Sequence, residues 1–315
     1  MVSSEEISKT PESNFQGIWN RSTQNSKVDS QVEQLSQQRP ELGSKKKNKQ
    51  WGIRSIVFNF ILLLVTQLIV GLGLAWLFVE QNGGDPTKIT TTLTSNPWVL
   101  LISSLSMYVV WVGGMLYVTY TKGQKSMAKD FGVKMKWYDP FIGIGIAAGL
   151  FGLVLAATWL LSDVLGLDMR GSDNGATISS FTGIWFFIIA IGIASILGPL
   201  CEELFFRGFV LRGIMKSITN HFVKINSEEE AGLGLRFAMW LDKSKGVIAV
   251  IVSSILFGLM HFQGTETFGQ WFVIIATGTL GLVFGIVALK MNRLGPVIFG
   301  HMFYNGTTLI LSTLS

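Results

Sequence analysis

Long apolar runs are the feature that most constrains how this chain can fold. Seven stretches are largely apolar over about 20 residues, the length that an α-helix needs to cross the hydrocarbon layer of a membrane. Only 14% of the residues are charged, against about 25% in an ordinary soluble domain. The pattern predicts an all-α fold, a polytopic membrane helix bundle with seven to eight transmembrane helices. The predicted spans are Ile56–Val79, Trp98–Tyr120, Pro140–Leu161, a run from Phe181 past Leu200, Gly246–Phe262, Trp271–Leu289 and Gly295–Leu314.

The first 50 residues differ in composition from everything that follows. They are rich in Ser, Gln, Asn, Glu and Lys and end in a basic cluster at Lys45, Lys46, Lys47 and Lys49. Such a segment cannot bury enough apolar surface to offset the entropy lost on ordering. The sequence therefore predicts a disordered tail over 1–50 and a transmembrane domain over 51–315. The first apolar run begins too far from Met1 to be a signal peptide.

Charge in the loops predicts the orientation of the chain. Basic loops, such as 121–139 and the long connection before Gly246, alternate with acidic or neutral ones, such as 80–97 and 263–270. Cytoplasmic loops carry the excess of Lys and Arg, so seven spans with the N-terminus in the cytoplasm satisfy the pattern. The net charge of +5 follows from this pattern and does not indicate a nucleic-acid partner. We expect an integral protein of the bacterial cell membrane.

Ionisable groups within spans are costly and are functional candidates by default. Glu202, Glu203 and Arg207 stand at the end of the fourth span, where an amphipathic helix over 203–218 continues or follows it. Glu203 and Arg207 are four residues apart and can pair on one helix face, which predicts a supporting role. Glu202 points elsewhere and has apolar neighbours, so it is the candidate proton acceptor. We expect the adjacent Cys201 to be a buried small residue and not a nucleophile.

Two histidines and an amide complete the set of polar groups within the spans. His261 ends the fifth span, and His301 lies one turn before Asn305 in the seventh. A carboxylate with a histidine can deprotonate water, and a histidine with an amide can stabilise an oxyanion. Glu202, His261 and His301 could instead bind a zinc ion with one open position for water. The chain contains neither H-E-x-x-H nor G-x-S-x-G, the usual signatures of zinc proteases and serine hydrolases.

Three motifs in order resemble those of the CPBP intramembrane proteases, the family that includes the type II CAAX prenyl endopeptidases and bacteriocin-processing proteins. The motifs are E-E-x-x-x-R at 202–207, F-x-x-x-H at 257–261 and H-x-x-x-N at 301–305. The resemblance covers about residues 130–312. It implies a protease in which Glu202 and His261 activate water, while His301 and Asn305 form the oxyanion hole. It also implies that Glu203 and Arg207 support the site, and that Phe257 belongs to the second motif.

The resemblance leaves mechanism and substrate open. Members of the family are described both as metalloproteases and as metal-free glutamate proteases, so zinc is a possible cofactor. The implied partners are the lipid bilayer and a prenylated protein or other membrane-anchored peptide. Two features depart from the pattern, the long tail and a stretch at 219–245 that looks inserted.

Two other classes of function compete with the protease. The same fold can serve as a non-proteolytic membrane scaffold or bacteriocin-immunity protein. A proton-coupled transporter is a third possibility, although no inverted repeat is evident. For a protease, helix rise places the site about 10–20 Å below the cytoplasmic surface. A structure with His261 on the extracytoplasmic surface, far from Glu202, would refute the assignment.

Overall fold

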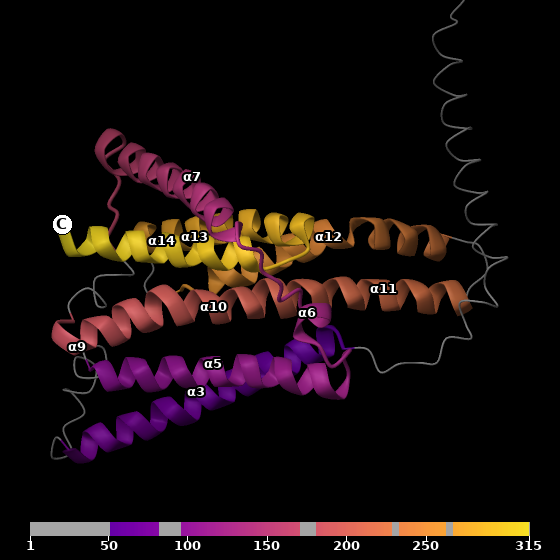
Figure 1. Ribbon diagram of the computed structural model, residues 1–315, viewed down its shortest axis with the longest axis horizontal. Helices are drawn as coiled ribbons and strands as arrows, with labels where there is room; N and C mark the ends of the chain where they lie inside the picture. The colour runs from indigo at the N-terminus through magenta and orange to yellow at the C-terminus, as the bar shows by residue number, and fades with distance from the viewer. Residues whose placement is uncertain (1–50, 82–95, 171–180, 229–232, 263–266, 315) are drawn as a thin grey trace, which may run out of the picture. The chain divides into compact units, whose positions relative to one another are not determined.

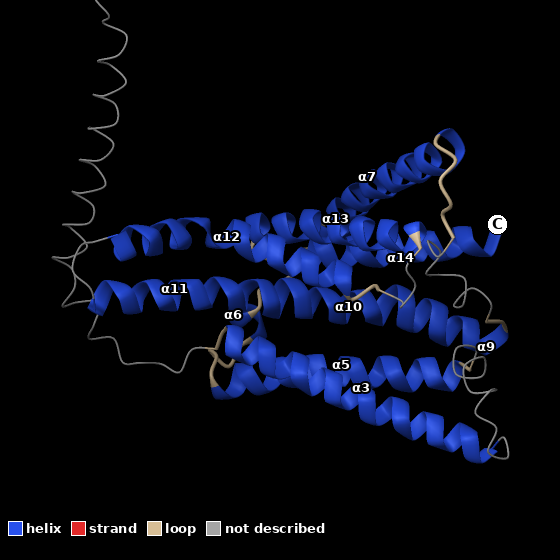
Figure 2. Cartoon of the chain, turned by 180° about the vertical axis from the view of Figure 1, so that it is seen from behind, coloured by secondary structure: helices blue, strands red, loops and turns tan. Residues whose placement is uncertain are grey.

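The computed structural model describes residues 51–81, 96–170, 181–228, 233–262 and 267–314, and all the regular structure within them is helical (Figure 2). The predicted all-α membrane fold is confirmed. The principal helices are α3 (Ile53–Gln81), α5 (Pro97–Thr121), α6 (Met127–Asp130), α7 (Asp139–Trp159), α10 (Gly198–Glu203), α11 (Leu211–Glu228), α12 (Leu233–Leu259), α13 (Phe268–Met291) and α14 (Gly295–Leu314). A short helix α9 (Gly183–Trp185) and three π-helical segments, η2 (Leu160–Val164), η3 (Phe186–Leu197) and η4 (Leu204–Val210), complete them.

Five helical segments of the described chain are long and apolar enough to cross a membrane. They are Ile53–Gln81, Pro97–Thr121, Asp139–Val164, Gly183–Val223 and Phe268–Met291. The predicted fifth and seventh spans correspond to α12 and α14, which are helical but more polar. α12 begins with several charged residues, and α14 contains His301 and Asn305. The count of seven to eight spans is therefore supported only in part.

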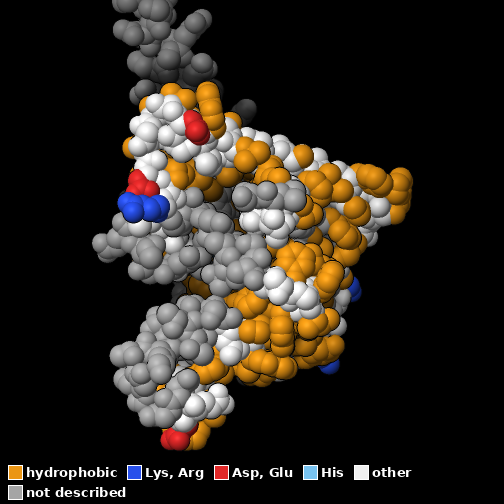
Figure 3. Space-filling model, turned by 90° about the vertical axis from the view of Figure 1, so that its left-hand side faces the viewer, with side chains coloured by type: hydrophobic (Ala, Val, Ile, Leu, Met, Phe, Trp, Pro, Cys, Tyr) orange, Lys and Arg blue, Asp and Glu red, His pale blue; other side chains and the backbone are white. Residues whose placement is uncertain are grey.

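The apolar helices expose many large hydrophobic side chains on the outside of the protein. In the most apolar window of α3 only 6% of the residues are buried, and large side chains such as Leu64 and Ile69 are exposed. Hydrophobic side chains likewise dominate much of the described face drawn in Figure 3. An apolar surface of this extent is far larger than a soluble monomer exposes. The chain is an integral membrane protein.

The fourth span and the amphipathic helix that was expected to continue or follow it form one continuous helix. The run Gly183–Val223 is 41 residues long, which corresponds to about 60 Å, roughly twice the hydrocarbon thickness. Its π-helical segments η3 and η4 flank α10, the short α-helical piece that carries Glu202 and Glu203. π-Helical turns within α-helices are often found at functional sites.

The chain divides into two compact units. Of the described residues, those up to 218 and those from 244 on belong to the larger unit, and those within 219–243 belong to the smaller one. The predicted disordered tail over 1–50 lies outside the described residues. Within the described part of the smaller unit, the Thr219 hydroxyl donates a hydrogen bond to Asp242, and the rings of Phe237 and Trp240 stack. Residues 219–243 nearly coincide with the stretch that looks inserted in the sequence.

Glycines bring the helices of the larger unit close together. α7 lies against α14 (Figure 1), and a Cβ atom at Gly143 would lie 2.6 Å from the backbone nitrogen of Gly300. A Cβ atom at Gly258 of α12 would lie 2.6 Å from the carbonyl oxygen of Ile274 of α13. Small residues permit this close backbone approach in membranes. These contacts position α12 and α14, the helices on which the two candidate histidines depend.

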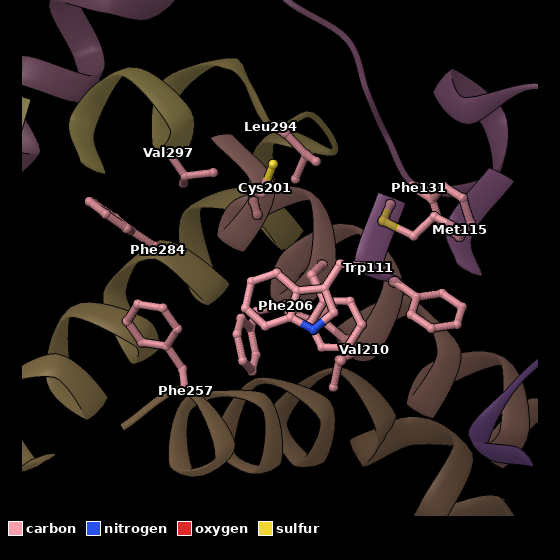
Figure 4. Packing of buried hydrophobic residues seen from close by; sticks show 14 of the residues in the cluster. Trp111, Met115, Phe131, Cys201, Phe206, Val210, Phe257, Phe284, Leu294 and Val297 are labelled. Carbon is pink, nitrogen blue, oxygen red and sulfur yellow. The ribbon is translucent and has the colours of Figure 1, made fainter. Parts of the chain in front are cut away.

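An aromatic cluster fills the centre of the larger unit. Trp111 of α5 stacks on Phe205 with ring centroids 4.7 Å apart, and Phe206 packs edge-on against Phe257. Cys201 lies in the same cluster, buried and free of any disulfide (Figure 4). The cluster fixes one face of the long helix, so that the residues on its other face are held in place.

A buried ion pair ties the α13–α14 turn to the start of α7. The guanidinium of Arg293 donates from Nε to Oδ1 of Asp139 at 2.9 Å, and its Nη2 lies 2.9 Å from the same oxygen. Hydrogen bonding to Asp139 raises the pKa of Arg293 above its ordinary value. Asn292 ends α13 in the left-handed conformation with φ of 50°, and its side chain accepts a hydrogen bond from Arg212. Together these contacts fix where α14 begins.

Candidate active site

Glu203 and Arg207 form a fully buried ion pair. Nη1 of Arg207 lies 3.0 Å from Oε1 of Glu203, and the two side chains are 1% and 0% exposed. In such surroundings each charge depends on the other, because a lone buried charge is strongly destabilising. The pairing predicted from the four-residue spacing is present in the structure.

His301 shares the same carboxylate oxygen. Its Nδ1 lies 2.8 Å from Oε1 of Glu203. A carboxylate can only accept, so we assign the ring hydrogen to Nδ1, which leaves a lone pair on Nε2 of the neutral ring. This Nε2 lies 3.7 Å from Oε2 of Glu202, too far for a direct hydrogen bond. Glu203 therefore sets the orientation of His301, and through it the atom that faces Glu202.

His261 is held at the end of α12 by two backbone contacts. Its Nδ1 lies 2.9 Å from the carbonyl oxygen of Phe257, so this nitrogen is the donor and Nε2 carries the lone pair. The carbonyl oxygen of His261 accepts a hydrogen bond of 3.1 Å from Nε2 of Gln270 on α13. The imidazole is thus anchored on one edge and leaves its other nitrogen available.

The ring of Phe257 connects the elements of the site. It packs edge-on against His261, with centroids 4.8 Å apart, and against His301, with centroids 5.7 Å apart. The guanidinium carbon of Arg207 lies 4.2 Å from the centroid of the same ring, a favourable cation–π distance. Phe257 is the aromatic residue of the second motif, and its contribution is to pack against these groups, not to take part in a reaction.

Asn305 lies on α14 one turn after His301. Its Nδ2 donates a hydrogen bond of 3.0 Å to the carbonyl oxygen of Ala194. An amide nitrogen carries two hydrogens, so one remains available to a ligand. The contact with Ala194 also ties α14 to η3.

A single cavity of about 420 Å³ brings the candidate residues together. Glu202, Phe257, His261, His301 and Asn305 all line it, whereas Glu203 and Arg207 are buried behind it. His261 and Glu202 therefore line the same space. The depth of the cavity below a membrane surface stays a prediction.

Most of the remaining cavity wall is apolar in effect. Four of its Thr and Ser residues bond through their hydroxyls to carbonyl oxygens of their own helices, namely Thr158, Thr277, Thr308 and Ser195. The threonines can then present their methyl groups to the cavity. Leu100, Ile189, Val273 and Leu309 line it as well. The charged and imidazole groups are therefore set in an apolar chamber, where electrostatic interactions are strong.

The described residues provide no preformed metal site. No group of three His, Cys, Asp or Glu side chains among them is placed to hold a metal ion. The 3.7 Å between Nε2 of His301 and Oε2 of Glu202 would allow those two atoms alone to share a zinc ion, since zinc bonds to such atoms are about 2.0–2.2 Å long. The donor atoms needed for zinc are Nε2 of both histidines and an oxygen of Glu202. They face one cavity but do not converge, so we derive no step through a metal.

Sequence reasoning missed Gln270, which supports this site, and Tyr108, which lines it. Gln270 is fully buried and bonds to His261, but the predicted span began at Trp271 and left it in a loop. Thr267 caps α13 by accepting a hydrogen bond from the backbone of Gln270, which moves the start of the helix back to Phe268. Tyr108 of α5 also lines the cavity. A tyrosine within an apolar span gives no distinct signal in a single sequence.

Comparison with known proteins agrees with this geometry. Residues 183–307 match the family described as Type II CAAX prenyl endopeptidase Rce1-like. The resemblance inferred from the three motifs is confirmed over this segment. The chain is also 21% identical, over 258 residues, to a Bacillus subtilis protein described as "Putative membrane peptidase YdiL", with 81% of this chain and 85% of the relative covered. No solved structure matches the chain. At the level of the family, the match supports a membrane-embedded protease.

Proposed function

We propose that the protein is an intramembrane endopeptidase that hydrolyses a peptide bond of a membrane-associated substrate. The observation that carries the proposal is the cavity in which Glu202, His261, His301 and Asn305 face one another. Oε2 of Glu202 is buried and makes no hydrogen bond to the described part of the chain. An unpartnered buried carboxylate is costly, which is reasonable where water or substrate completes the site.

In this mechanism Glu202 accepts a proton from a water molecule, and Nε2 of His261 accepts a hydrogen bond from the same water. The water oxygen attacks the peptide carbonyl carbon, and negative charge develops on the carbonyl oxygen. The free hydrogen of the Asn305 amide donates to that oxygen. His301 donates to it as well when solvent has protonated its Nε2 before the attack, and it keeps that proton throughout the reaction. The proton held by Glu202 then moves to the leaving nitrogen, and the peptide bond breaks.

The substrates that we propose are prenylated proteins of the CAAX type or other membrane-anchored peptides. The family match supports the first class, and the apolar chamber suits either. The N-terminus is proposed to lie in the cytoplasm of a bacterial cell, because the basic loops alternate with neutral ones. Reporter fusions to 121–139 and to 263–270 would test this, and a cytoplasmic signal from both loops would contradict it.

Purified protein in lipid nanodiscs would test the activity. We expect wild-type protein to cleave a prenylated CAAX peptide or a membrane-anchored peptide, and Glu202→Ala and His261→Ala to be at least about 100-fold slower, because general base catalysis contributes this much. Cys201→Ala is the matched control, since Cys201 adjoins Glu202 but is buried in the core and does not line the cavity. Full cleavage by both site variants would refute the proposal.

Two further arms decide the alternatives. Loss of wild-type activity with a chelator, and its return with zinc, would establish a metal-dependent mechanism that uses Glu202, His261 and His301. A cellular phenotype that survives Glu202→Ala, together with no cleavage by wild-type protein, would favour a non-proteolytic scaffold or immunity protein.

A further inference from the structure

A hydroxyl group faces the cavity beside Glu202 without a hydrogen-bonding partner. Tyr108 of α5 is 7% exposed, and its ring packs near Trp111. Its hydroxyl makes no hydrogen bond within the part of the chain that the structure describes. Because Tyr108 lines the cavity, water can reach this hydroxyl, and a phenol hydroxyl in such a place normally finds a partner. Tyr108 lies outside residues 183–307, the segment that matches the family.

A glycine keeps space open between this hydroxyl and the carboxylate. A Cβ atom at Gly198 would lie 2.9 Å from the hydroxyl oxygen of Tyr108 and 3.8 Å from Oε1 of Glu202. The two side chains therefore border the same point from different helices. A water molecule that bridges them would lie beside this point, in van der Waals contact with the Cα atom of Gly198 and about 2.5–3.0 Å from each oxygen. All three residues line the cavity.

The two oxygens of Glu202 then face different partners. Oε2 lies 3.7 Å from Nε2 of His301, whereas Oε1 faces the space beside Gly198 and Tyr108. A carboxylate on a flexible side chain needs contacts at both oxygens to hold one orientation. Among the described residues, the Tyr108 hydroxyl is a hydrogen-bond donor that borders the same space as Oε1.

We propose that Tyr108 is a positioning residue of this site: its hydroxyl binds Oε1 of Glu202 through a water molecule held beside Gly198, and thereby keeps Oε2 directed toward His301. The inference rests on the proposed function, because it assigns a role through Glu202. It adds α5 to the helices that build the site. It also gives a reason for glycine at 198, since a larger residue would occupy the place of the water.

The test is the steady-state kinetics of Tyr108→Phe in nanodiscs. This variant keeps the ring and its packing and removes only the hydroxyl. We expect kcat to fall roughly 10-fold or more with KM nearly unchanged, because a hydrogen bond to a charged group contributes on this scale and acts here on the chemical step. Tyr117→Phe is the matched control, since Tyr117 lies on the same helix and is 58% exposed.

A second substitution separates positioning from packing. Gly198→Ala fills the proposed water position and should lower kcat as well, and combining it with Tyr108→Phe should give little further loss, because both act on one contact. Unchanged kcat in Tyr108→Phe, or independent effects of the two substitutions, would overturn the inference. A rise in KM alone would also overturn it and would place the hydroxyl on the substrate.

The outcome is distinguishable from failure of the proposed function. If wild-type protein cleaves the peptide and Glu202→Ala does not, the protease stands whatever Tyr108→Phe shows. Thermal unfolding in detergent, followed by tryptophan fluorescence, should be the same for wild-type protein and Tyr108→Phe within a few degrees. This comparison excludes misfolding as the cause of a lower kcat.

Discussion

Glu203 has two functions that paired substitutions can separate. Its Oε1 lies 3.0 Å from Nη1 of Arg207 and 2.8 Å from Nδ1 of His301. The single substitution Glu203→Leu removes both contacts and leaves the fully buried Arg207 without its partner. Loss of one member of a buried pair costs about 3–5 kcal/mol. We therefore expect a large fall in stability and loss of activity.

The double variant Glu203→Leu with Arg207→Met should recover the stability but not the activity. Replacing a buried pair by apolar residues of similar volume is often neutral, whereas His301 still lacks the acceptor that orients it. The matched variant is Glu203→Gln with Arg207→Met. Its amide oxygen can accept from Nδ1 of His301, so we expect it to keep part of the activity.

Equilibrium unfolding in mixed micelles measures the stability of these variants, and cleavage in nanodiscs measures their activity. If the Leu–Met variant is stable and as active as the Gln–Met variant, the bond between Glu203 and His301 does not orient the imidazole. If neither double variant recovers stability, the cost does not arise from an unpaired Arg207. Either result would refute the corresponding step of the reasoning.

Three further predictions concern the supports of the site. Gln270→Leu should lower cleavage about 10-fold with a smaller effect on stability, because the carbonyl oxygen of His261 loses its donor. Kinetics of the folded variant check this, and an unchanged kcat would contradict it. Gly143→Val should destabilise the protein by about 1–3 kcal/mol through overpacking. Equilibrium unfolding would compare it with Gly145→Val, because nothing lies within 4 Å of a Cβ atom added at Gly145. Equal losses of stability in the two variants would contradict the prediction. Arg293→Gln should cost about 3–5 kcal/mol because it leaves Asp139 buried and unpaired, and Arg293→Gln with Asp139→Asn should recover part of that loss in the same assay.

The apolar runs were sufficient to predict an all-α membrane fold, because burial in lipid requires long helices with internally bonded backbones. The ends of the helices were less predictable. α13 begins at Phe268 and not at Trp271, since Thr267 provides the cap. Likewise, apolar periodicity could not decide whether the amphipathic stretch after Glu203 forms a separate helix or continues the preceding one, as it does in the structure.

The polar residues of the candidate site could be selected from their chemistry, but the contacts between them could not be predicted. Glu202, His261, His301 and Asn305 are conspicuous because polar groups are scarce within apolar spans. The bond between His301 and Glu203 joins residues 98 positions apart, and no local spacing indicates it. The places of Tyr108 and Gln270 were equally unpredictable. Only the folded structure shows that Tyr108 lines the cavity and that Gln270 bonds to His261.

Consecutive carboxylates have opposite environments here, and helix geometry is the cause. Glu202 and Glu203 are offset by about 100° around the helix axis, so one faces the cavity and the other faces Arg207 and the protein interior. Glu203 is held by a charged partner and an imidazole, and Glu202 has no hydrogen bond at its buried oxygen. A group already engaged by strong partners is a poor acceptor for a substrate-derived proton, whereas an unengaged one beside two imidazole lone pairs is suited to that task. The same backbone turn therefore separates the group that orients His301 from the group that is available to act on water.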